Sequence, residues 1–68
     1  MKIFGERLRE LRTEKGLSAM ALAKALGMGD ASIINWENNK NDILAENLVK
    51  IAKYFGVTTD WLLGLQSE

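Results

Sequence analysis

The 68-residue chain contains no cysteine, no histidine and no proline. The absence of cysteine excludes a disulfide framework and a thiolate metal site. The absence of histidine removes the most common metal ligand and the most common general base. An enzyme would have to depend on carboxylates such as Glu10, Asp42 and Glu46, which all have ordinary surface or capping explanations. We therefore expect neither catalysis nor a metal or cofactor.

The chain also lacks an excess of either charge and any long apolar run. Nine Lys and Arg residues balance nine Asp and Glu residues. Most nucleic-acid-binding domains of this size are basic, so a zero net charge argues against such a partner unless a few cations are placed locally. No transmembrane run or signal peptide is recognisable, so no membrane partner is expected, and a cytoplasmic location fits the composition.

What the sequence does contain is a high apolar content in a helical pattern. Hydrophobic residues make up 47% of the chain and charged residues 26%, which is typical of a folded domain. Apolar residues recur at three- and four-residue spacing, and glycines stand where the repeats end. We expect one all-α domain over residues 1–68, with no separate ligand-binding or oligomerisation domain. The predicted helices cover residues 4–15, 19–26, 30–37, 45–55 and 59–63.

Residues 17–37 organise the rest of the chain. Two short helical patterns flank Gly27-Met28-Gly29, and Ser18 is a suitable N-cap for the first of them. Gly27 can adopt the left-handed conformation that ends a helix. This layout places a second helix in the major groove of DNA in helix-turn-helix proteins. It is equally compatible with two core helices joined by a tight turn, and the spacing alone does not separate the two interpretations.

Motifs along the whole chain resemble one family. They are Gly5-Glu6-Arg7-Leu8-Arg9-Glu10-Leu11-Arg12, Gly16-Leu17-Ser18, Leu22-Ala23-Lys24-Ala25-Leu26-Gly27, Ile33, Trp36-Glu37-Asn38, Lys40, Leu48, Ile51-Ala52, Phe55-Gly56-Val57 and Asp60-Trp61-Leu62-Leu63-Gly64. In this order and spacing, the chain resembles the helix-turn-helix domains of the phage lambda-repressor and Cro type, also called the XRE family. The resemblance implies a five-helix domain whose second helix crosses the DNA backbone and whose third helix enters the major groove.

The resemblance also assigns residues. It implies a structural ion pair between Arg12 and Glu37, which positions the third helix and reads no bases. The positions that would face the bases are Asp30, Ala31, Ile34 and Asn35. The positions that would contact phosphates are Ser18, the backbone N–H of Ala19, and the loop residues Asn38, Asn39, Lys40 and Asn41.

The base-facing positions depart from the usual family pattern because they carry little charge. Asn35 can form two hydrogen bonds to adenine, and Ala31 and Ile34 can contact a thymine methyl group. Asp30 can accept from cytosine but would be repelled by phosphates, so a helix-capping role is favoured. Ala19 replaces a glutamine that is common in the family. Together these residues predict A/T-directed reading and a shallow salt dependence of binding.

The C-terminal end carries more apolar residues than a short helix needs. The resemblance implies that Val57, Trp61, Leu62 and Leu65 contribute to a homodimer contact, although Trp61 and Leu62 could simply close the core. A dimer would read two half-sites about 34 Å apart. The leading hypothesis is a homodimeric, phage-type repressor that binds a palindromic operator on double-stranded DNA, with no small-molecule ligand. The alternative is a protein-interaction module of the same fold with weak or no DNA binding.

Overall fold

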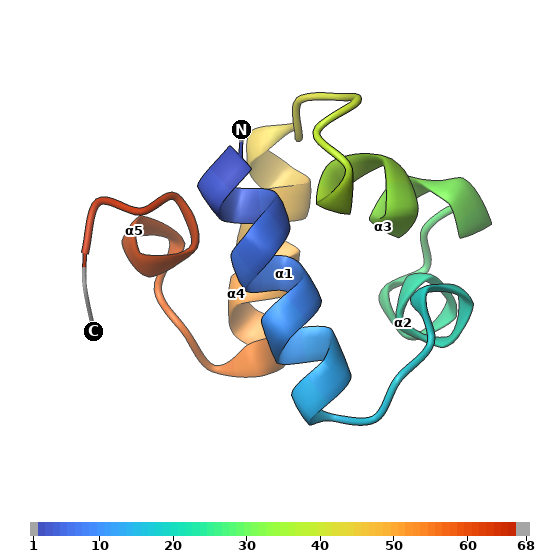
Figure 1. The fold of residues 1–68 in the computed structure, drawn as a ribbon. Coiled ribbons are helices and arrows are strands. Elements are labelled where there is room, and N and C mark those ends of the chain that lie inside the picture. Colours follow the sequence, from blue (N-terminus) through green and yellow to red (C-terminus); the bar gives the residue numbers. More distant parts are fainter. Residues whose placement is uncertain (1, 67–68) are drawn as a thin grey trace.

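A computed structural model describes residues 2–66 of the chain, and the secondary structure of this part consists of helices joined by turns and loops (Figure 1). The five helices are α1 (Lys2–Glu14), α2 (Ala19–Leu26), α3 (Asp30–Glu37), α4 (Ala45–Phe55) and α5 (Thr59–Leu62). The described residues contain no strand. The prediction of an all-α fold with five helices is confirmed.

Local hydrogen bonds and backbone conformation set most of the helix boundaries. The Ser18 hydroxyl accepts from the backbone N–H of Ala21 at 3.0 Å, and the Thr58 hydroxyl accepts from that of Trp61 at 3.0 Å. Both are N-cap bonds to a free donor in the first turn. At the other end of α2, Gly27 has a φ of 69°, which is the left-handed C-cap conformation. These caps fix α2 and the start of α5 where the sequence predicts them.

Three predicted boundaries differ from the structure, namely both ends of the first helix and the end of the last. The first helix begins at Lys2, two residues earlier than expected, and ends at Glu14. Ile3 lies against Gly64, so the first turn of α1 is packed against the chain after α5. The last helix ends at Leu62 and not at residue 63, which is within the usual variation of a helix end.

The core receives one fully buried large side chain from each helix: Leu8, Leu22, Ile33, Ile51 and Leu62. Phe4, Ala23, Leu26, Trp36 and Ala52 complete the buried cluster. The rings of Phe4 and Trp36 meet edge to face with centroids 6.5 Å apart, which joins α1 to α3. Because every helix contributes to this single cluster, the short helices α2, α3 and α5 depend on tertiary packing for their stability.

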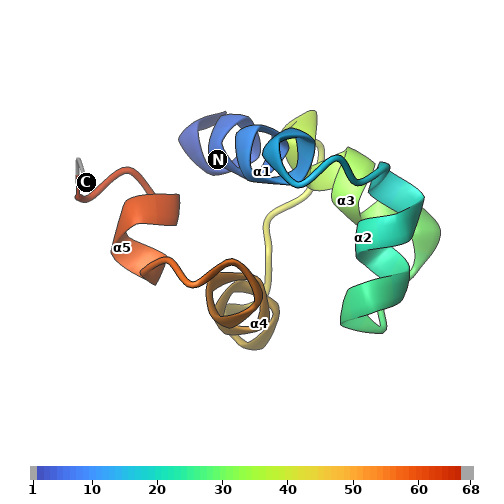
Figure 2. The same cartoon turned by 90° about the horizontal axis from the view of Figure 1, so that it is seen from below.

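The helices are arranged around α1. The α2–α3 pair packs on one side of α1 and α5 on the other, so the pair and α5 lie at opposite ends of the molecule (Figure 2). The fourth helix contacts both α2 and α5. Within residues 2–66, no helix has the length and apolar character needed to span a membrane.

Candidate nucleic-acid interface

The turn between α2 and α3 is short and fully hydrogen-bonded at its start. The N–H of Gly27 donates to the carbonyl of Lys24 and that of Met28 to the carbonyl of Ala23, at 3.2 and 2.8 Å. Gly29 is the N-cap of α3 and provides no side-chain cap. The prediction that Asp30 caps this helix was wrong: Asp30 is the first helical residue. Its carboxylate is exposed in the first turn, where it complements the helix dipole.

The third helix has one buried and one exposed face. Ile33, Trp36 and Glu37 are buried, as their spacing predicts. The opposite face consists of the four residues that the sequence places against bases. Of these, Asp30, Ala31 and Ile34 are exposed and Asn35 is partly exposed. Ile34 is one of several large apolar residues that remain exposed, at 49%.

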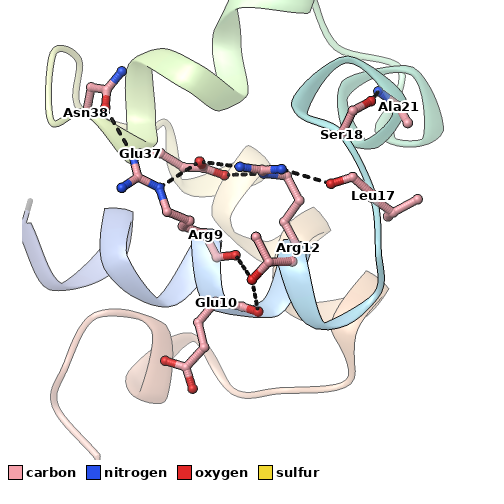
Figure 3. Close-up of polar contacts among 9 residues, drawn as sticks. Arg9, Glu10, Arg12, Leu17, Ser18, Ala21, Glu37 and Asn38 are labelled. Carbon is pink, nitrogen blue, oxygen red and sulfur yellow. Dashed lines mark hydrogen bonds and ion pairs between the residues drawn. The ribbon is translucent and has the colours of Figure 1, made fainter.

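Glu37 anchors α3 to α1 through the ion pair that the resemblance implies (Figure 3). Arg12 Nε donates to Glu37 Oε2 at 2.7 Å, and a terminal guanidinium nitrogen of Arg12 donates to Oε1 at 2.9 Å. This bidentate geometry is the strong form of an arginine–carboxylate contact. The Glu37 side chain is only 3% exposed, so the pair compensates a buried charge. Arg12 also donates to the carbonyl of Leu17 at 2.8 Å, which ties the chain entering α2 to the same cluster.

A second arginine, Arg9, joins this cluster, although no functional role was predicted for it. Arg9 Nε lies 3.3 Å from Glu37 Oε1, and a terminal nitrogen of Arg9 donates to Asn38 Oδ1 at 3.1 Å. Arg9 and Arg12 are three residues apart and therefore share one face of α1. That spacing was visible in the sequence, but nothing local indicated that both side chains meet the end of α3.

Gly5 explains how α1 approaches the end of α3 so closely. A Cβ atom at this position would lie 2.7 Å from the carbonyl oxygen of Trp36 and 2.9 Å from that of Glu37. It would also lie 3.1 Å from Oδ1 of Asn39, whose left-handed backbone (φ 59°) turns the chain out of α3. Only a residue without a side chain permits this contact between two backbones.

The predicted phosphate-contacting residues lie at the start of α2 and in the loop after α3. Ser18 uses its hydroxyl oxygen as an acceptor for the cap, which leaves the hydroxyl hydrogen to donate elsewhere. The side chain of Ala19 packs against the core, so any contact with a phosphate would come from its backbone N–H. Asn38, Asn39, Lys40 and Asn41 are all exposed in the loop.

The residues predicted to form the dimer contact differ in how deeply they are buried. Leu62 is completely buried and belongs to the core, so its assignment to a dimer contact was wrong. Trp61 is partly buried and stacks under Arg7, whose guanidinium carbon is 4.5 Å from the ring centroid. Arg7 also donates to the carbonyl of Trp61 and thereby holds α5 on α1.

The two remaining members of this set are accessible. Leu65 is 75% exposed, the largest exposed fraction among the big apolar residues described. Val57 is partly buried beside a hollow of about 270 Å³. Gly56, Val57, Thr58, Trp61 and Gln66 line this hollow.

A family model for a helix-turn-helix domain matches residues 5–68, almost the whole chain. The chain belongs to the XRE-type helix-turn-helix family. Within this family it is 42% identical over 60 residues to the HTH-type transcriptional activator BcrR of Enterococcus faecalis, and 33% identical over 60 residues to the regulator ImmR of Bacillus subtilis. These matches cover 88% of the chain in both cases, but only 29% of BcrR and 47% of ImmR. The chain thus spans less than half the length of these two relatives.

Solved structures of the family share the fold in detail. The c2 repressor of phage P22 in complex with a synthetic operator superposes with a TM-score of 0.86 at 29% identity, covering 97% of this chain and 100% of that one. The restriction-modification controller protein C.AhdI of Aeromonas hydrophila gives a TM-score of 0.79 at 35% identity, covering 88% and 91%. The helix-turn-helix arrangement of α2 and α3 is therefore the one this family adopts.

Proposed function

We propose that this chain is a sequence-specific DNA-binding regulator of transcription, of the phage repressor type. In this proposal it binds a palindromic operator as a homodimer and inserts α3 into the major groove. The observation that carries it is the exposed face of α3, held outward by the buried Arg12–Glu37 pair at one end of the helix. The P22 c2 repressor, which has the same fold, was crystallised with an operator, and that supports the proposal.

The exposed face of α3 suits A/T base pairs better than G/C pairs. Asn35 is the residue best able to read a base, because its amide matches the acceptor and donor of adenine in the major groove. Ala31 and Ile34 are exposed beside it and provide apolar contact for a thymine methyl group. No arginine or lysine lies on α3, so the common arginine–guanine contact cannot come from this helix.

Phosphate contacts would come from few charges. Lys40 and the three neighbouring asparagines lie in one exposed loop, and Ser18 with the N-terminus of α2 offers uncharged donors. Each neutralised phosphate steepens the dependence of binding on salt. With so few cations available, the logarithm of the binding constant should fall only gently with the logarithm of the salt concentration.

Asn35→Ala is expected to lower discrimination between operator and unrelated duplex by about 5- to 150-fold, equivalent to about 1–3 kcal/mol. The operator would first be selected from a pool of random duplexes and then titrated by fluorescence anisotropy. Asn47→Ala, in α4 and outside the set of residues proposed to contact DNA, is the matched control. If Asn35→Ala discriminates like the wild type while remaining folded, α3 is not the reading helix. If the wild type selects no duplex and shows no salt-sensitive binding at micromolar protein, the chain is instead an interaction module of this fold.

The proposed dimer would use Leu65 and the hollow beside Val57 and Trp61, because these present apolar surface at the end of the molecule that holds α5. Leu65→Glu is expected to shift the protein from dimer to monomer in sedimentation velocity experiments and to weaken operator binding at least about tenfold, since each half-site would then bind alone. Leu44→Glu changes a residue of similar exposure (66%) in another part of the chain and should leave the dimer intact. A Leu65→Glu protein that dimerises normally would refute this interface.

A further inference from the structure

Arg9 connects the ion pair under α3 to the first residue of the loop that follows it. Its Nε lies 3.3 Å from Glu37 Oε1, and one terminal nitrogen donates to Asn38 Oδ1 at 3.1 Å (Figure 3). The Arg9 side chain is 54% exposed, whereas that of Glu37 is 3% exposed. Arg9 therefore connects the buried Glu37 carboxylate to the exposed loop that begins at Asn38.

The contact with Arg9 fixes which way the amide of Asn38 faces. A guanidinium group only donates hydrogen bonds, so the amide oxygen must face it and the NH₂ group must point away. Figure 3 shows the amide nitrogen on the side away from Arg9. The backbone N–H of Asn38 already donates to the carbonyl of Ile34 at 3.0 Å. The side-chain NH₂ is consequently the donor that Asn38 offers to a partner.

We propose that Arg9 is a positioning residue for DNA binding, which orients the Asn38 amide so that its NH₂ group donates to a DNA phosphate. This inference rests on the function proposed above and adds a residue and a mechanism to it. The loop that includes Asn38 also contains Lys40, the single cation between the end of α3 and Asp42. Where cations are this sparse, an uncharged donor can supply part of the binding to phosphate. Its hydrogen bond to a charged phosphate is stronger than one to a neutral acceptor.

Orienting Asn38 in this way requires an arginine at position 9. The fold, in contrast, depends little on Arg9. The planar guanidinium presents Nε to Glu37 and a terminal nitrogen to Asn38 at the same time, which a single ammonium group at the end of a flexible chain cannot do in the same geometry. The bidentate contact between Glu37 and Arg12 does not involve Arg9. The Arg9 side chain is half-exposed and makes the longer, 3.3 Å contact with Glu37, so it contributes less to folding than Arg12 does. Changes at Arg9 should therefore affect binding more than stability.

The test is a double-mutant cycle on operator binding with Arg9→Lys, Asn38→Ala and the combined variant. Each single change is expected to weaken binding by about threefold to tenfold. The combined variant should bind no more weakly than the poorer single variant, because Arg9 acts through Asn38. Since Arg9→Lys keeps the charge, its salt dependence should equal that of the wild type. In the free protein, Arg9→Lys should shift the side-chain NH₂ resonances of Asn38 in an amide NMR spectrum.

A second cycle with Arg9→Lys and Asn47→Ala is the matched control and should be additive. Wild-type affinity of Arg9→Lys, or losses that multiply in the Arg9–Asn38 cycle, would overturn the inference while leaving the proposed function in place. An unchanged NH₂ resonance of Asn38 in the free Arg9→Lys protein would overturn it without reference to DNA. A wild-type protein that binds no duplex would instead overturn the proposed function, and the inference with it.

Discussion

Arg12→Met is expected to lower the free energy of unfolding by about 3 kcal/mol, because it leaves the buried Glu37 carboxylate without its main partner. Arg12 supplies the two shortest contacts to that carboxylate, at 2.7 and 2.9 Å. The remaining contact, from the half-exposed Arg9, is 3.3 Å long. A domain of this size has only a few kcal/mol of net stability, so the variant should retain little of it.

Urea denaturation followed by circular dichroism measures this loss. The double variant Arg12→Met/Glu37→Met should recover most of it, since replacing both members of a buried pair by apolar residues is often close to neutral. Arg9→Met is the matched control and should cost less than about 1 kcal/mol, because Arg9 is half-exposed and the two shorter contacts of Glu37 come from Arg12. A double variant as unstable as Arg12→Met would show that the buried charge is not the reason for the loss.

The charge of Arg12 in the Arg12–Glu37 pair should stabilise the fold well into the alkaline pH range. The hydrogen bond to Glu37 raises the pKa of Arg12 above its ordinary value, aided by the charge of Glu37 and opposed by partial burial. A folded-state pKa above the unfolded one means that this contribution is fully present below the unfolded pKa and is lost only as the pH rises through the folded pKa. For arginine, the pH range in which this stabilisation is lost lies far into the alkaline range. On account of Arg12, stability should not decline between neutral and mildly alkaline pH.

Gly5→Ala is expected to destabilise the protein by about 2 kcal/mol, against the ordinary trend for a helix. Alanine is normally better than glycine within a helix by about 1 kcal/mol. Here the added Cβ would overlap the carbonyl oxygens of Trp36 and Glu37, at 2.7 and 2.9 Å, and neither backbone can move aside without shifting a helix. Moving α1 away from α3 would also separate Arg9 and Arg12 from Glu37, so operator binding should weaken as well.

Urea denaturation tests this prediction too, with Gly29→Ala as the control. Gly29 has a φ of −68°, and the nearest atom to an added Cβ, Ser32 Oγ, is 3.8 Å away. Its replacement should cost no more than about 1 kcal/mol, from a poorer N-cap. If Gly5→Ala is as stable as the wild type, the two backbones do not approach as closely as described.

The sequence predicted which residues of α3 are exposed, but it did not predict all of the contacts that hold α3 in place. The exposed face of α3 follows from the spacing of Ile33, Trp36 and Glu37, because a helix that buries these residues must expose the opposite side. The involvement of Arg9 was not predictable, since a surface arginine on α1 has the same local signature whether or not it meets another helix. The sequence left Leu62 between a dimer contact and the core, because apolar character alone does not distinguish a core residue from an interface residue.

Local sequence patterns were enough to predict the five helices, the ends of α2 and the start of α5, and which face of each helix is apolar. These features depend on hydrogen bonds within one turn, such as those of Ser18 and Thr58, and on the backbone preference of Gly27. The tertiary structure alone decided the close crossing at Gly5, the sharing of Glu37 by two arginines and the burial of Leu62. Those depend on distances between helices remote in the chain, which packing of the common core sets and no local pattern encodes.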